Sequence, residues 1–165
     1  MILRSPVEPD RAAIEDMVSD FESHNSAYDG AFWEKGSFDF DVWLDECRRA
    51  QTEPVKEGFV CAQQFVSFDE TGTALGFLNL RLELNDYLRE QGGHIGYSIR
   101  PTQRGRGYAK EQLRLGLQKA YEADINPVLI TCHNTNPASR ATILSQGGVL
   151  EEVRRGVERY WLSLE

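Results

Sequence analysis

The chain lacks the features of several protein classes. Its 165 residues include only three cysteines, Cys47, Cys61 and Cys132, which share no C-x-x-C spacing, and only three histidines. Scattered cysteines of odd number predict reduced core thiols rather than disulfides, and this spacing assembles no metal site. No hydrophobic run is long enough to cross a membrane, and the N-terminus lacks the apolar core of a signal peptide. We therefore expect a cytoplasmic protein without a metal and without a membrane partner.

Positive charge is also scarce. Lys and Arg total 18 against 26 Asp and Glu, which gives a net charge of −8. Proteins that bind DNA or RNA need an excess of Lys and Arg, so nucleic acid is not an expected partner. The length and a hydrophobic content of 41% are those of one soluble globular domain, which we expect to span residues 1–165.

The hydrophobic periodicity predicts the order of the secondary structure. We expect strands at 2–4, 59–68, 73–84, 94–99, 128–132, 149–153 and 160–164, and helices at 8–21, 39–51, 108–124 and 137–147. The segment between residues 24 and 38 follows neither period, and 85–93 and 154–159 are expected to be connections. This order is typical of an α/β fold in which about four helices pack on a single mixed sheet.

The most informative stretch reads GGHIGYSIRPTQRGRGYAKEQ, in the middle of the chain. A strand there passes into a helix through Gly105 and Gly107, so backbone N–H groups converge at the start of the helix, where the helix dipole favours negative charge. Arg104, Arg106 and Lys110 add positive charge at the same place. The pattern predicts a phosphate site, although a plain basic helix start remains the alternative. It matches neither the common phosphate loop nor the dinucleotide fingerprint.

Three motifs resemble one known family. Residues 104–109, RGRGYA, match the (Arg/Gln)-x-x-Gly-x-(Gly/Ala) loop that binds the acetyl-CoA pyrophosphate in the GNAT superfamily of N-acetyltransferases. Before it, residues 97–101, YSIRP, resemble the family's central strand, whose amides hold the pantetheine arm and the thioester oxygen. After it, residues 136–139, NPAS, followed by Gly147-Gly148, resemble the family's Asn-bearing helix. The order of elements is similar over nearly the whole chain, in particular to a bacterial-type subgroup of predicted acetyltransferases.

The resemblance implies an activity and a set of binding residues. It implies an N-acetyltransferase that moves the acetyl group of acetyl-CoA to an amine of a small molecule or peptide, by direct attack in a ternary complex. Members of the family often form homodimers, but no sequence feature decides the oligomeric state here. The residues that the resemblance assigns to acetyl-CoA are Tyr97, Ser98, Ile99, Arg104, Gly105, Arg106, Gly107, Tyr108, Ala109, Lys110, Asn136 and Ser139.

The catalytic residues are less clear, because Ile143 occupies the position where many family members have a Tyr that acts as general acid. A thiol of pKa about 8.5 leaves readily, whereas an alkyl amine of pKa about 10.4 is only about one part in 2,500 unprotonated at pH 7. A base therefore matters more than an acid. Candidates for the base are Glu83, His94 and His133, and Tyr97 is a candidate donor of the thiol proton.

The acceptor site is expected in the irregular segment between residues 24 and 38. Tyr28, Phe32 and Trp33 could line an acceptor pocket, and packing over the edge of the core is the alternative. Acidic residues around the segment fit a cationic acceptor and fit a solvated surface equally well. The missing Tyr at Ile143 also keeps open another class of function, a CoA-binding sensor or interaction module that has lost its chemistry.

Overall fold

The computed structural model describes residues 1–31, 33 and 36–165. In chain order the elements are β1 (Ile2–Arg4), α1 (Arg11–Ser23), α2 (Phe40–Ala50), β2 (Ala62–Phe68), β3 (Ala74–Arg81), α3 (Asp86–Glu90), β4 (Ile95–Ile99), α4 (Tyr108–Glu122), β5 (Val128–His133), α5 (Pro137–Ser145), β6 (Val149–Arg154) and β7 (Val157–Leu162). Short 3-10 turns, η1 (Glu8–Asp10) and η2 (Pro101–Gln103), precede α1 and the glycine loop. Within the described ranges, no helix is both long and apolar enough to span a bilayer.

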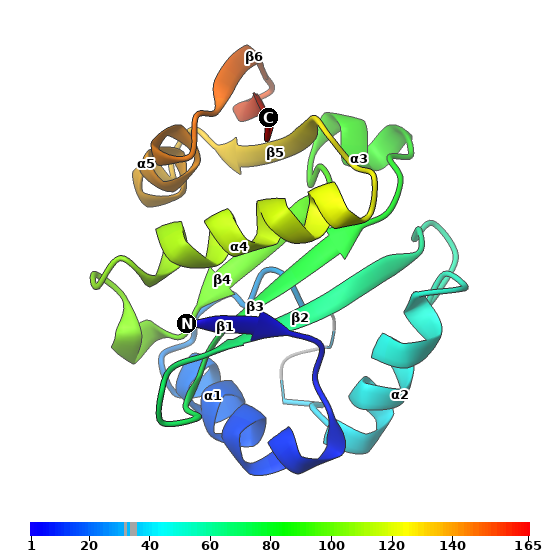
Figure 1. Cartoon of the computed structure of the whole chain (residues 1–165), viewed down its shortest axis with the longest axis vertical. Helices are drawn as coiled ribbons and strands as arrows, with labels where there is room; N and C mark the ends of the chain where they lie inside the picture. Colours follow the sequence, from blue (N-terminus) through cyan, green and yellow to red (C-terminus); the bar gives the residue numbers. More distant parts are fainter. Residues whose placement is uncertain (32, 34–35) are drawn as a thin grey trace.

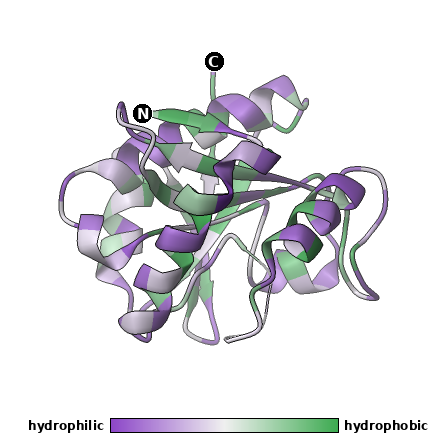
Figure 2. Cartoon of the chain, turned by 90° about the horizontal axis from the view of Figure 1, so that it is seen from below, coloured by the Kyte–Doolittle hydropathy of each residue, from purple (hydrophilic) through white to green (hydrophobic). Residues whose placement is uncertain are grey.

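The strands form two antiparallel sheets, with the order β1-β2-β3-β4 in the first and β5-β7-β6 in the second. Helices α1 and α2 cover one face of the first sheet and α4 covers the other (Figure 1). On the α1 and α2 side, Phe77 packs against Phe21 and Trp43. On the α4 side, Leu78 of β3 packs with Leu113 of α4. Figure 2 accordingly shows hydrophobic residues on the strands and hydrophilic residues on the outward surfaces of the helices.

The α/β class with flanking helices is confirmed, but the expectation of a single mixed sheet is wrong, because β4 and β5 meet at one point and then separate. The backbone N–H of His94 donates to the carbonyl oxygen of Leu129 (2.7 Å), and the N–H of Leu129 donates to Nδ1 of the His94 ring (2.9 Å). Gly93 permits this approach, since a Cβ there would lie 2.3 Å from the Leu129 carbonyl oxygen. Beyond this contact the two strands share no ladder, so each belongs to its own sheet.

Helix α3 differs from the prediction that residues 85–93 form only a connection. The signal for it is Asn85, whose side chain caps the helix by accepting a hydrogen bond from the Leu88 N–H (2.9 Å). Strand β3 therefore ends at Arg81, three residues earlier than predicted, and Glu83 lies in a bend beyond it. The predicted polar side of β3 is also buried, because α1 and α2 cover it.

The last strand begins earlier than predicted. Strand β7 begins at Val157 and therefore includes Glu158 and Arg159, which the sequence places in a charged turn. Both are buried, because Arg140 pairs with Glu158 and the carboxylates of Glu151 and Glu152 pair with Arg159. Ion pairing thus lets charged residues continue the strand, and the turn shrinks to residues 155–156.

Candidate active site

The backbone of β4 offers hydrogen-bond donors on its outer edge. The Arg100 N–H donates to the Leu75 carbonyl oxygen of β3 (2.8 Å), which fixes the alternation of the antiparallel ladder. Tyr97 and Ile99 are at the alternate positions, so their N–H groups turn away from β3 toward the gap between β4 and β5. Strand β4 lies at the edge of its sheet, and these groups can bind an extended ligand.

The loop before α4 is open and rich in unpaired N–H groups. Gly105 and Gly107 have φ values of +78° and +82°, and no atom of the described residues lies within 4 Å of the Cβ that a side chain would add at either position. The first backbone bond of α4 runs from the Glu111 N–H to the Gly107 carbonyl oxygen (3.3 Å), so the N–H groups of residues 108–110 remain available. This cradle fits a diphosphate.

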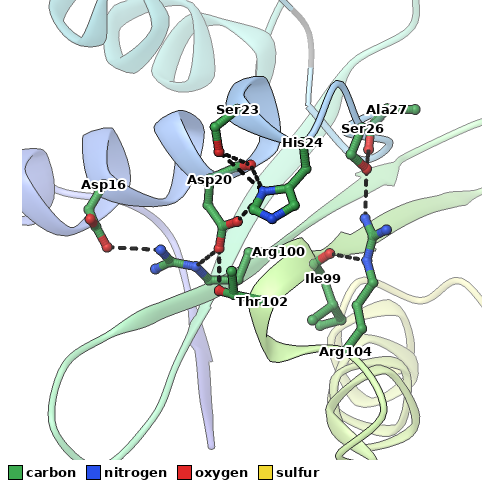
Figure 3. Close-up of polar contacts among 10 residues, drawn as sticks. All are labelled: Asp16, Asp20, Ser23, His24, Ser26, Ala27, Ile99, Arg100, Thr102 and Arg104. Atoms are coloured by element: carbon green, nitrogen blue, oxygen red, sulfur yellow. Dashed lines mark hydrogen bonds and ion pairs between the residues drawn. The ribbon is translucent and has the colours of Figure 1, made fainter.

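The basic side chains of the loop differ in their contacts. Arg106 and Lys110 are exposed, and neither makes a hydrogen bond or ion pair within the described part of the chain. Arg104 is engaged instead: its Nε donates to the Ile99 carbonyl oxygen (2.8 Å) and its Nη2 donates to Oγ of Ser26 (2.8 Å) (Figure 3). Arg104 therefore ties the loop to β4 and to the segment after α1.

A buried ion pair anchors the end of β4 to α1. Nε of Arg100 donates to Oδ2 of Asp20 (2.7 Å), Nη2 of Arg100 lies 2.9 Å from Oδ2 of Asp16, and the Thr102 hydroxyl also donates to Asp20 (Figure 3). Burial alone would raise the pKa of Asp20, but the hydrogen bonds from Thr102 and Arg100 outweigh it and hold the pKa below its usual value. The anchor fixes where the glycine loop begins.

A cavity of about 460 Å³ lies along the loop and β4. All the residues predicted to bind acetyl-CoA line it except Arg106: Tyr97, Ser98, Ile99, Arg104, Gly105, Gly107, Tyr108, Ala109, Lys110, Asn136 and Ser139. The three motifs, which are separate in the sequence, are thus brought to one cavity.

A second cavity, of about 650 Å³, opens where β4 and β5 diverge. Its walls come from 25–31, Arg81, α3, residues 95–97 of β4 and residues 131–133 of β5. It shares wall residues with the first cavity: Ser26, Ala27, Asp29, Tyr97, Asn136 and Ser139. The two cavities therefore adjoin, and a molecule in one can reach a molecule in the other.

Tyr97 lies at the junction between the cavities. Its hydroxyl is 3.2 Å from Oγ of Ser139, and burial raises its pKa to about 12, so it stays protonated at neutral pH. Asn136 positions Ser139, because its Oδ1 caps α5 by accepting the Ser139 N–H (3.1 Å). Ile143, by contrast, is fully buried in the core. The junction thus holds a neutral hydroxyl donor from β4.

The segment between α1 and α2 closes over β4. Oγ of Ser98 donates to the Asp29 carbonyl oxygen (2.6 Å), and a Cβ at Gly30 would lie 2.5 Å from the Gly96 carbonyl oxygen. Tyr28 lines the second cavity and stacks on Trp33, with ring centroids 4.4 Å apart.

Trp33 itself does not line this cavity. It packs among Phe38, Trp43 and Phe77 at the edge of the core, which favours the packing alternative for this residue. Phe32, also predicted to line the acceptor site, lies outside the described residues.

The three predicted bases fall in different environments. Glu83 is exposed and lines neither cavity. His94 is buried, its Nδ1 accepts the Leu129 N–H, and burial together with the nearby charge of Arg81 lowers its pKa to about 4. His133 lines the second cavity.

Sequence reasoning did not single out Arg81, which lines the second cavity. Arg81 stands at the end of β3. The alternating pattern of β3 predicts that Arg81 lies on a polar face of the strand. The pattern does not show that this face borders the cavity beside β4.

Comparisons with known proteins agree with this geometry. The model of the acetyltransferase (GNAT) domain matches residues 1–149. Among solved structures, yncA of Salmonella typhimurium, solved with its cofactor acetyl-CoA, is 20% identical with a TM-score of 0.65, and the match covers 99% of this chain and 94% of that one.

Two further structures are similar at lower identity. A point mutant of the spermidine N-acetyltransferase SpeG from Vibrio cholerae is 16% identical with a TM-score of 0.62, covering 99% and 95% of the two chains. A phosphinothricin acetyltransferase from Sinorhizobium meliloti, in complex with AcCoA, is 17% identical with a TM-score of 0.62, covering 99% and 88%. These likenesses show the fold. No curated protein sequence matches the chain. The family model, which spans most of the chain, establishes that the chain belongs to the GNAT family and is an acetyl-CoA-dependent N-acetyltransferase.

Proposed function

We propose that the chain acetylates an amine by direct attack in a ternary complex. In this proposal the N–H groups of residues 105–110 bind the diphosphate of acetyl-CoA, and the outer edge of β4 binds its pantetheine arm. The amine enters through the second cavity. The observation that carries the proposal is that the two cavities share Tyr97 and Ser139 in their walls, so donor and acceptor can meet there.

The chemistry requires little from side chains. The neutral amine nitrogen forms a bond to the thioester carbonyl carbon, the carbon–sulfur bond breaks, the nitrogen loses a proton and the thiolate gains one. A backbone N–H on the outer edge of β4, from Tyr97 or Ile99, can donate to the carbonyl oxygen as its negative charge develops. The Tyr97 hydroxyl can donate to the sulfur. His133 lines the acceptor cavity, and we propose that it takes the amine proton directly or through water.

Valine substitution at two matched glycines tests the acetyl-CoA site. Gly107 and Gly72 have φ values of +82° and +84°, and both have open space where a Cβ would be added. Gly107→Val and Gly72→Val should therefore lose similar stability through backbone strain. Only Gly107→Val fills the cradle, so only this variant should lose acetyl-CoA binding by calorimetry, by about 100-fold or more. Unchanged binding in Gly107→Val would contradict the proposed site.

Because Ile143 leaves α5 without the family's usual acid, turnover by this chain is tested against the alternative of a CoA-binding module without catalysis. Thiol release from acetyl-CoA separates the two. The purified chain is incubated with amino acids, peptides, polyamines and aminoglycosides, and free thiol is measured over time. Release that depends on an amine supports the enzyme, whereas tight acetyl-CoA binding without release on any acceptor supports the module.

A further inference from the structure

Arg81 differs from the other enclosed arginines of the chain. Arg100 contacts the carboxylates of Asp16 and Asp20, and Arg159 contacts those of Glu151 and Glu152. Arg81 makes no ion pair with any described residue, and its side chain makes one hydrogen bond there, from Nη1 to the Gly92 carbonyl oxygen (3.0 Å). A guanidinium has five N–H groups, so most of its donors have no protein partner in the described ranges.

The fold reserves space for this side chain. Arg81 is the last residue of β3, and its guanidinium crosses β4 at Gly96. A Cβ at Gly96 would lie 2.9 Å from Nη2 and 3.0 Å from Nη1 of Arg81. Any residue larger than glycine would push the guanidinium from its place in the wall of the acceptor cavity. A glycine in the middle of a strand has a cost, which this close approach explains.

The charge of Arg81 is not neutralised by its surroundings. Burial lowers its pKa, while Asp29 and Tyr87, the groups that face it, act in the opposite direction. The Asp29 carboxylate nevertheless lies more than 4 Å away, because the two form no ion pair. An enclosed charge without a partner is unfavourable, and an anion entering the cavity would remove that penalty.

The remaining wall of the cavity shows where each part of an acceptor would lie. Within the described part of the chain, the ionisable residues that line this cavity are Asp29, His133 and Arg81, together with tyrosines and Cys132. Asp29 belongs to the junction with the first cavity, whereas Arg81 does not. A polycation would bring a second positive group to Arg81, and the described residues of the cavity wall include no cluster of carboxylates to hold it.

We propose that the acceptor is an amine that also carries a carboxylate, as a free amino acid does, and that Arg81 binds this carboxylate while the amine faces the junction at Tyr97. This inference rests on the proposed function and names its substrate class. The planar guanidinium suits two parallel hydrogen bonds to a carboxylate, and this geometry sets the acceptor apart from spermidine-like polyamines.

Matched acceptors test the inference. Thiol release is measured with the twenty L-amino acids, the α-amide of each and spermidine, on the wild-type chain, Arg81→Met and the control Arg114→Met, which changes an exposed arginine of α4. At least one acid should exceed its amide by 10-fold or more in kcat/KM. Arg81→Met should reduce that preference by about 10- to 100-fold, mainly through KM, while the amide changes less than about twofold and the control changes neither.

A second variant guards against misfolding. Gly96→Ala keeps the charge of Arg81 but displaces the guanidinium, and it should reduce the same preference while acetyl-CoA binding, measured by calorimetry, is retained. The inference is overturned if amides or spermidine react as well as the acids, if they react and no acid does, or if Arg81→Met lowers kcat/KM equally for acid and amide. Failure of the wild-type chain to bind acetyl-CoA, or binding without thiol release on any acceptor, would instead overturn the proposed function.

Discussion

The acetyl-CoA region and the acceptor region of this protein are built differently. The first comes mainly from one continuous stretch, residues 97–110, completed by the cap of α5 at Asn136. It offers a ligand the backbone N–H groups that glycines leave accessible, and the proposed function assigns these groups to acetyl-CoA. The second is assembled from 25–31, Arg81, α3 and the end of β5, and its wall presents side chains such as Arg81 and His133. A site for acetyl-CoA, the donor that the whole family uses, can be built from one continuous motif. A site that selects the acceptor is built from segments that are distant in the sequence and come together only in the fold.

The two regions also handle positive charge differently. Arg106 and Lys110 of the acetyl-CoA region are exposed, so water compensates their charge before the ligand arrives. Arg81 of the acceptor region is enclosed and has no ion pair within the described residues. Binding at the first region should therefore weaken with salt, while recognition at the second should depend more on fit than on ionic strength.

The largest effect is expected from removing the anchor under the acetyl-CoA region. Asp20→Ala leaves the buried Arg100 with the exposed Asp16 as its one remaining ion-pair partner among the described residues, which should cost about 3 kcal/mol of unfolding free energy. Because the pKa of Asp20 lies below its usual value, this contribution is present above about pH 4 and is lost as the pH falls through the lowered pKa. Urea unfolding at pH 7 and pH 3 measures both.

Asp16→Ala is the matched control, since this carboxylate contacts the same guanidinium but its side chain is 68% exposed. It should cost less than about 1 kcal/mol. Equal losses for the two variants would show that the buried pair does not anchor the loop.

A smaller effect is expected where β4 and β5 meet, at the base of the acceptor region. The pKa of His94 is about 4 in the folded chain, against about 6.5 in an unfolded one. Between these values the unfolded chain binds a proton that the folded chain excludes, so stability should fall as the pH drops from 6.5 to 4, by at most about 1.4 kcal/mol for each pH unit. His94→Asn keeps an acceptor for the Leu129 N–H and should lack this part of the pH dependence. If the unfolding free energy of the wild type and of His94→Asn depended on pH in the same way, His94 would not be the source of this pH dependence.

The same contrast explains what could be predicted from sequence. Glycines, the Asn136 cap and the order of elements are local or periodic signals, so the sequence can predict the fold class and the residues that line the first cavity. The divergence of β4 and β5 depends on the His94 ring replacing a ladder bond, which no local pattern shows. Arg81 reaches the wall of the second cavity where its side chain crosses Gly96, a residue fifteen positions later in the chain. Glu83 was misplaced because the alternation of leucines continued past the true end of β3.

Tyr97 belongs to both regions, and its hydroxyl should have a moderate effect on the rate alone. Tyr97→Phe should lower kcat about tenfold, because a thiolate leaves readily without full proton transfer, and should change acetyl-CoA affinity less than about twofold. Since the pKa of Tyr97 is about 12, ionisation of this group should not reduce the wild-type rate up to about pH 10. Tyr121→Phe, at an exposed tyrosine of α4, is the control. Steady-state kinetics measure kcat, and calorimetry measures acetyl-CoA affinity. An unchanged kcat in Tyr97→Phe would exclude a role for the hydroxyl.

The smallest effect is expected from Arg104, which joins the two regions. Its guanidinium holds the Ile99 carbonyl oxygen and Oγ of Ser26, so Arg104→Met should loosen the loop and the acceptor segment together. We expect about 1 kcal/mol, seen as a threefold to tenfold rise in both the Kd for acetyl-CoA and the KM for the acceptor. Ser26→Ala removes only the second contact and should change the acceptor KM more than the acetyl-CoA Kd. If Arg104 instead binds the diphosphate directly, Arg104→Met will weaken acetyl-CoA more than tenfold, flatten its salt dependence and leave the acceptor KM unchanged, because a charge lost from the ligand itself affects one binding site and not its neighbour.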